Sequence, residues 1–164
     1  PLSTMGAHIC ACPNHSVGRT TPMETRAHVA LAGTFGYELD LTKLTEEEKK
    51  KATAFNQEYH KYNDLVREGD YYRLASYREN NMYDCWQVVS PDRSESLVPY
   101  VQARFEVMRK SRRLRLEGLD PKAAYRLEGT DQVFSGEMLM NAGYLQEMLR
   151  GDYGSVLLHF VKKD

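Results

Sequence analysis

Four side chains that could bind a metal ion lie close together near the start of the sequence. The pattern H-x-C-x-C-x2-H is formed by His8, Cys10, Cys12 and His15. Imidazole nitrogens and thiolates are ligands that zinc prefers. The first three alternate along a run typical of a strand, where residues two apart are separated by roughly 7 Å. Zinc ligands must instead converge to about 2.0–2.3 Å from one ion. We therefore expect no metal at these four residues and no cofactor elsewhere.

The elements that position these residues follow the order strand, helix, strand. Residues 8–12 are mostly small or apolar and are followed by turn-forming residues. Thr21 is expected to cap the next helix, with Glu24 completing a capping box. Gly33 is expected to end this helix in the left-handed conformation. Residues 35–41 then alternate as in a strand. This spacing predicts a βαβ unit with parallel strands.

A second helix follows directly. Thr45 and Glu48 predict a capping box, and the acidic first turn suits the helix dipole. Apolar side chains recur at helical spacing through residues 55–66, and Gly69 ends the run. Residues 1–69 thus have the order β-α-β-α.

The pattern changes to short strands after residue 69. The runs with strand composition are residues 71–76, 85–90, 96–104, 112–117, 123–128 and 155–161. Turn-forming residues separate them. Leu114 and Leu116 alternate with charged residues, as in a sheet with one face in water. We predict an all-β antiparallel sandwich over residues 70–164.

The two halves therefore differ in class. A parallel pair of strands with two helices does not close a core, because parallel sheets are buried on both faces. We interpret residues 1–69 as an α/β barrel remnant, the two terminal βα units of a TIM barrel. The chain begins at Pro1 rather than at Met, which also suggests a fragment. A small self-sufficient α/β domain is the alternative for this half.

Several separated motifs resemble the carboxyl-terminal third of bacterial α-galactosidases, the melibiases of glycoside hydrolase family 36. They are PLSTMGAHICACPNH, VGRTTPMETRAHVALAGTFGYELDLTKL, GDYYRL, LRLEGLDP with AYRLEG, SGEMLMNAG and GDYGSVLLHF. The resemblance implies an enzyme with an amino-terminal β-supersandwich, a (β/α)8 catalytic barrel and a carboxyl-terminal β-sandwich.

The resemblance also implies retaining hydrolysis of terminal α-galactosides such as melibiose and raffinose. Retaining enzymes need two carboxyl groups about 5 Å apart. The family places both aspartates in tryptophan-containing motifs on earlier barrel strands. Trp86 is the only tryptophan here, and its surroundings, CWQVV, match neither motif. No catalytic residue is carried over, and we expect the chain alone to be inactive. The alternatives are an α-N-acetylgalactosaminidase, or a non-catalytic structural or carbohydrate-binding module.

Three residues are candidates for binding the substrate. Barrel active sites lie at the carboxyl ends of the strands. His8, Asn14 and His15 would lie at or near this rim, where they could bind sugar hydroxyl groups. The alternative is structural, with His8 inside the barrel and Asn14 stabilising its loop.

Composition excludes several other classes. The net charge is −1, so the basic cluster Arg109, Lys110, Arg112, Arg113 and Arg115 does not indicate a nucleic-acid partner. We expect no membrane span, because an apolar run of about 18 residues is missing. Three cysteines do not suggest a disulfide framework, which favours the cytoplasm. We expect the parent enzyme to be a homo-oligomer.

Overall fold

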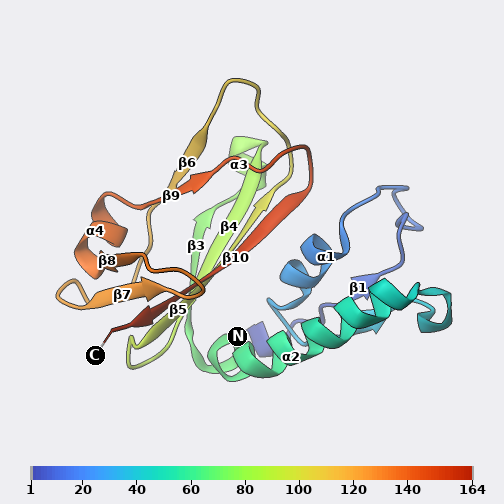
Figure 1. Cartoon of the computed structure of the whole chain (residues 1–164), viewed down its shortest axis with the longest axis horizontal. Helices are drawn as coiled ribbons and strands as arrows, with labels where there is room; N and C mark the ends of the chain where they lie inside the picture. Colours follow the sequence, from blue (N-terminus) through green and yellow to red (C-terminus); the bar gives the residue numbers. More distant parts are fainter. Residues whose placement is uncertain (1, 164) are drawn as a thin grey trace. The chain divides into compact units, whose positions relative to one another are not determined.

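The computed structural model describes residues 2–163. The chain divides into two compact units, Pro1–Arg67 and Glu68–Asp164. Figure 1 labels the elements of both.

The first unit contains two very short strands and two helices. Its elements are η1 (Leu2–Thr4), β1 (Ile9–Cys10), α1 (Met23–Ala30), β2 (Tyr37–Glu38), η2 (Leu41–Lys43) and α2 (Glu46–Glu68). β1 and β2 are parallel, with Ile9 opposite Tyr37 and Cys10 opposite Glu38. The predicted parallel pairing is confirmed. Both strands are shorter than predicted, because regular pairing covers two residues in each.

One face of this strand pair packs on the helices. Ile9 is fully buried and packs with Met23 and Ala27 of α1 and with Ala52 and Phe55 of α2. The hydroxyl of Tyr37, opposite Ile9, donates a hydrogen bond to the Ala52 carbonyl at 2.9 Å. Successive side chains of a strand point to opposite faces. The neighbours of Ile9 and Tyr37 therefore lie on the face away from this cluster.

The two predicted capping boxes have different outcomes. In α2 the Thr45 Oγ1 accepts from the Glu48 N–H at 3.2 Å, and Glu48 Oε2 accepts from the Thr45 N–H at 2.9 Å. The Thr45 N–H also lowers the pKa of Glu48. The box predicted for α1 is wrong. That helix begins at Met23 after Pro22, without a side-chain cap.

Glu24 and Gly33 make contacts with other segments of the unit. Glu24 forms an ion pair with Lys51 of α2, with the carboxylate and the ammonium 2.8 Å apart. Gly33 does not take a left-handed φ, contrary to the prediction. A Cβ atom there would lie 2.3 Å from the Met5 carbonyl oxygen. Close approach of two backbone segments, rather than conformation, requires this glycine.

The second unit is a mostly antiparallel β-domain. Its elements are β3 (Asp70–Ala75), α3 (Tyr77–Asn80), β4 (Tyr83–Val89), β5 (Glu95–Gln102), β6 (Ser111–Leu114), β7 (Ala124–Leu127), β8 (Val133–Ser135), α4 (Gly136–Asn141), β9 (Tyr144–Glu147) and β10 (Gly154–Lys162). Six strands form one sheet in the order β3-β4-β5-β10-β7-β8, and β6 pairs with β9 in a separate ribbon (Figure 1). Every predicted run overlaps a strand, whereas β8, β9 and α3 were not predicted. The arrangement is consistent with a β-sandwich.

A single apolar core joins the sheet, the ribbon and α4. Its fully buried members include Cys85, Tyr100, Leu139 and Phe160. Side-chain amides tie irregular segments to the central strands. Gln87 of β4 donates to the Glu117 carbonyl at 3.0 Å and accepts from the Glu117 N–H at 2.8 Å. Since these backbone groups lie outside the strands, the glutamine replaces a missing strand partner.

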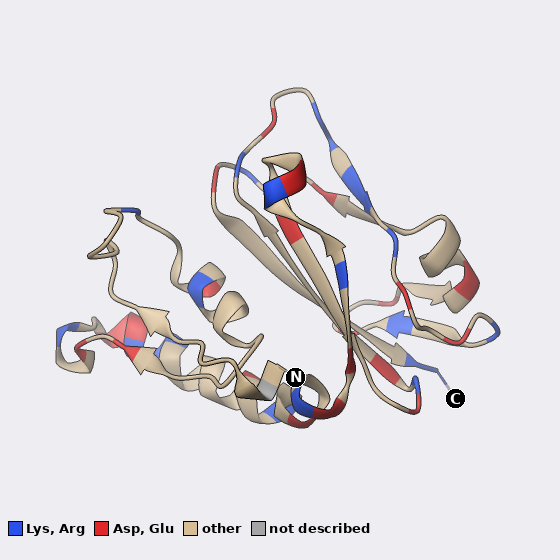
Figure 2. Ribbon diagram, turned by 180° about the vertical axis from the view of Figure 1, so that it is seen from behind, with Lys and Arg blue, Asp and Glu red and all other residues tan. Residues whose placement is uncertain are grey.

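Arg112 is buried, although the charged residues of this strand were expected to face water. It is 8% exposed, and its guanidinium lies 4.4 Å from the centre of the Tyr83 ring. Its Nη2 donates to a Glu106 carboxylate oxygen at 3.0 Å. Arg112 shares its face with the buried Leu114, whereas Arg113 is exposed. In Figure 2, positions of acidic and basic residues alternate along the backbone of the β-domain.

The His159 ring of β10 lies between two carboxylates, one from β5 and one from the residue after β7. Its Nε2 lies 2.8 Å from a Glu95 carboxylate oxygen, and its Nδ1 lies 2.7 Å from one of Glu128. Glu95 begins β5, His159 is in β10, and Glu128 follows β7. One imidazole ring thus contacts carboxylates from both neighbouring parts of the sheet.

None of the described helices, within residues 2–163, has the length and apolar character needed to cross a membrane. All three cysteines are free thiols.

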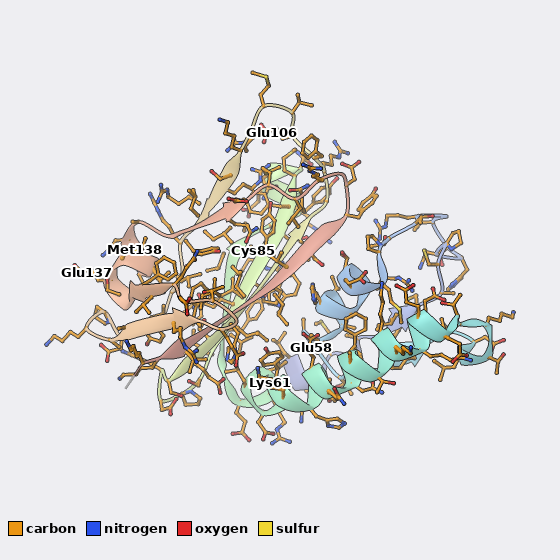
Figure 3. All side chains as sticks on the ribbon, viewed as in Figure 1. Glu58, Lys61, Cys85, Glu106, Glu137 and Met138 are labelled. Carbon is orange, nitrogen blue, oxygen red and sulfur yellow. The ribbon has the colours of Figure 1, made fainter. Side chains whose placement is uncertain are left out.

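We predict that Cys85 resists thiol reagents in the folded chain. It is fully buried, and this burial raises the pKa of its thiol to about 12 (Figure 3). The thiolate is the reactive form. Titration with a disulfide reagent at mildly alkaline pH should therefore modify Cys10 and Cys12 first, and Cys85 only after denaturation. A Cys85→Ser variant should lose only the late reaction. Rapid modification of all three thiols in the native chain would contradict this.

A second prediction concerns the turn between β4 and β5. Hydrogen bonds from Ser90 and Ser94 lower the pKa of Asp92 from 3.8 to about 2. A carboxyl group with a lowered pKa in the folded state stabilises it when ionised. Its contribution should be complete above about pH 4 and lost as the pH falls towards about 2.

The measurement is urea unfolding of unit 2 across this pH range. An Asp92→Asn variant should lose this component of the acid dependence. Asp131→Asn, in the turn between β7 and β8, is the control for removing one negative charge. Superimposable pH profiles for the wild type and Asp92→Asn would refute the assignment.

Candidate functional site

The candidate site lies where β1 and β2 end. The carboxyl ends of parallel strands meet at one edge of a sheet, and the loops that follow them share that edge. Residues 11–22 follow β1, and residues 39–45 follow β2. Asp40 accepts from the Thr42 hydroxyl at 2.6 Å and from the Thr42 N–H at 3.0 Å. These bonds lower the pKa of Asp40, and they use this carboxylate to begin η2.

Arg26 of α1 holds the loop after β1. Its Nη1 donates to the Cys10 carbonyl, and its Nε donates to the Thr21 carbonyl at 3.2 Å. The Cys12 thiol lies 3.6 Å from the same Thr21 oxygen. Both ends of the loop are therefore anchored to one side chain of a helix, which fixes the place of the residues between them.

Asn14 stabilises this loop from within. Its Oδ1 accepts from the Ser16 N–H at 3.0 Å and from the Val17 N–H at 3.1 Å. Its carbonyl accepts from the Gly18 N–H at 2.8 Å. Within residues 2–163, its Nδ2 donates no hydrogen bond. The amide nitrogen is thus the part of Asn14 that could donate to a ligand.

His15 and His8 have different surroundings. His15 is exposed in the loop beside Asn14. His8 precedes β1, and its Nε2 lies 2.6 Å from a carboxylate oxygen of Glu38 on β2. The structure therefore brings together Asn14 and His15 in one loop, and it joins His8 to Glu38 instead of to either of them.

Sequence reasoning missed Glu38 as a member of this site. The signal was present in the alternation of residues 35–41, which puts Glu38 on the face opposite Tyr37. The sequence does not reveal the strand register, which places Glu38 directly opposite Cys10. This edge offers hydrogen-bond donors and acceptors suited to a polar ligand.

Several aromatic side chains of the β-domain are buried or packed against its core. Trp86 and Tyr100 are buried, while Tyr72 and Tyr83 pack against the core. Tyr71 is 40% exposed and lies beside Arg73. A carbohydrate-binding module built on these residues is not favoured.

Two family models match the chain. Residues 1–69 match Melibiase, and residues 83–160 match the glycosyl hydrolase family 36 C-terminal domain.

Individual relatives match almost the whole chain. The α-galactosidase AgaA of Geobacillus stearothermophilus is 45% identical over 96% of the chain, which covers 21% of that protein. The probable α-galactosidase G of Aspergillus terreus is 43% identical over 99% of the chain, which covers 22% of it.

Solved structures of α-galactosidases have the same fold over this length. The crystal structure of AgaA superimposes with a TM-score of 0.95 at 43% identity, covering 99% of this chain and 22% of that one. An AgaA variant in complex with raffinose gives a TM-score of 0.95 at 42% identity, with the same coverage. The chain thus spans about one fifth of the length of the relatives that it matches. It belongs to glycoside hydrolase family 36 and corresponds to the carboxyl-terminal portion of the family's α-galactosidases.

Proposed function

We propose that this chain is part of a retaining α-galactosidase that hydrolyses terminal α-galactosides of the melibiose and raffinose type. The observation that carries the proposal is the match to AgaA through both units, with a TM-score of 0.95. Variants of that relative have been solved with raffinose and with stachyose. Both ligands are α-galactosides, which supports this substrate class for the whole protein.

We further propose that residues 1–69 are the last two βα units of a (β/α)8 barrel and that residues 70–164 are the closing β-sandwich. Each of the parallel strands β1 and β2 is followed by a helix, as barrel units require. The helices cover the face of Ile9 and Tyr37. The uncovered face carries His8, Cys10 and Glu38, and it corresponds in this proposal to the barrel interior.

The role proposed for this chain is to complete the substrate site and not to supply the reacting groups. Retaining hydrolysis uses two carboxyl groups about 5 Å apart. The tryptophan-containing motifs expected to carry them do not occur in this sequence. Asn14 fixes the loop after β1, from which its Nδ2 would donate to sugar hydroxyl groups and the His15 ring would donate to or accept from them. A cytoplasmic location and a homo-oligomeric parent enzyme belong to the same proposal; the three free thiols support the former.

The first test compares the 164-residue chain with a longer polypeptide that also contains the proposed catalytic motifs. The chain alone should not hydrolyse an α-galactoside, whereas the longer protein should. NMR of the first product should show galactose in the α configuration, because two displacements retain configuration. Activity of the isolated chain would contradict the division of labour, and a β-configured first product would contradict the mechanism.

The second test uses substitutions in the loop after β1, made in the active longer protein. His15→Ala and Asn14→Ala should each lower kcat/KM about three- to tenfold, the value of a hydrogen bond or two. Ser16→Ala is the matched control, because the recorded bond of Ser16 to Asn14 uses its backbone N–H. If both variants stay within about twofold of the wild type, neither residue contacts the sugar.

A further inference from the structure

One arginine closes the base of the loop that carries Asn14 and His15. Arg26 lies in the first turn of α1, and its Nη1 donates to the carbonyl of Cys10, the last residue of β1. Its Nε donates to the carbonyl of Thr21, shortly before α1 begins, at 3.2 Å. A single guanidinium group therefore joins the end of the strand to the start of the helix.

Two backbone hydrogen bonds close the same loop nearer its tip. The Asn14 N–H donates to the Arg19 carbonyl at 2.9 Å, and the Asn14 carbonyl accepts from the Gly18 N–H at 2.8 Å. These bonds fix the conformation of the tip within the loop. The two bonds from Arg26 hold the base of the loop against β1. Together the bonds form a nested series, with the Arg26 side chain as its outermost member.

The position of Arg26 in its helix explains how it reaches both carbonyl groups. Side chains of a helix point toward its amino-terminal end, so the Arg26 side chain covers the residues that precede it. A guanidinium group presents its N–H donors on three nitrogens in a fixed plane, whereas lysine carries all its donors on one nitrogen. The two bonds of Arg26 use different nitrogens, Nε and Nη1. The bridge therefore depends on an arginine and not on any cation.

The charge of Arg26 also acts on a second residue. Hydrogen bonds from Thr45 lower the pKa of Glu48, and the positive charge of Arg26 contributes in the same direction. Glu48 caps α2, the helix that follows β2. Removal of the guanidinium would therefore remove both a bridge and a charge. A lysine at this position separates the two effects, because it keeps the charge.

We propose that Arg26 is a positioning residue of the substrate site, which acts on the sugar through Asn14 and His15. The inference rests on the proposed function, in which the side chains of those two residues bind sugar hydroxyl groups. It requires no contact between Arg26 and the sugar. Both bonds of the bridge join groups within residues 10–26, so the bridge is complete in this chain.

The kinetic test is a double-mutant cycle in the active longer protein. Arg26→Gln and Arg26→Lys should each lower kcat/KM for melibiose about three- to tenfold, the range expected for Asn14→Ala and His15→Ala. In a protein that already carries Asn14→Ala and His15→Ala, Arg26→Gln should lower it less than about twofold, because no sugar-binding side chain remains to be positioned. A purely structural arginine would instead give an additive loss, and that result would overturn the proposal.

Two further variants complete the comparison. Arg113, in the second unit, also donates to a backbone carbonyl, that of Ala142, at 3.0 Å. Arg113→Gln is therefore the matched control and should stay within about twofold of the wild type. Wild-type activity of Arg26→Lys, beside a loss in Arg26→Gln, would assign the effect to charge and overturn the bridge. Circular dichroism verifies that each variant is folded.

Amide hydrogen exchange provides a readout that needs no activity. The N–H groups of Ser16, Val17 and Gly18 should exchange several-fold faster in Arg26→Gln than in the wild type, while those of α2 keep their protection. Unchanged exchange in the loop would overturn the proposal, whatever the substrate of the enzyme. Faster exchange in the loop of a protein whose wild type cleaves no α-galactoside would contradict the proposed function and not the bridge.

Discussion

The first unit depends on the parallel pairing of β1 and β2, which is covered by helices on one face. Ile9 and Tyr37 direct one side of the pair into the cluster of α1 and α2. The same alternation necessarily places His8, Cys10 and Glu38 together on the other side. The apolar packing and the polar cluster are therefore two results of one register. A slip of one residue would exchange the faces and destroy both.

In the second unit, polar side chains of the strands form hydrogen bonds with backbone groups of irregular segments that have no strand partner. The Gln87 side chain forms hydrogen bonds with both the N–H and the carbonyl of Glu117. The Gln102 side chain does the same with the N–H and the carbonyl of Leu149. Both glutamines are fully buried, where unpaired amides would be costly. The contacts of the His159 ring with Glu95 and Glu128 join parts of the sheet that already lie side by side. The long irregular connections are thus fixed by specific bonds as well as by the apolar core.

Local features of the sequence predicted the structure better than features that depend on distant partners. The capping box of Thr45 and Glu48 is confirmed because both residues are within one helical turn. The box of Thr21 and Glu24 is wrong, since α1 has Pro22 at its N-cap and Glu24 contacts Lys51, far along the chain. Most strands were located, since alternation and turn formers are local signals. The place of Asn14 and His15 after a strand could be anticipated, but Glu38 required the register of β1 and β2.

The position of β10 in the sheet has a consequence for biosynthesis. β10 lies between β5 and β7, at the centre of the six-stranded sheet, and it comes from residues near the end of the described chain (Figure 1). During translation, β5 and β7 must wait without their shared neighbour until residue 162 has left the ribosome. Domains otherwise tend to fold as they emerge, from the amino-terminal side. Closure of this sheet is therefore a late event, and a nascent chain stalled before residue 154 would display two unpaired strand edges to chaperones.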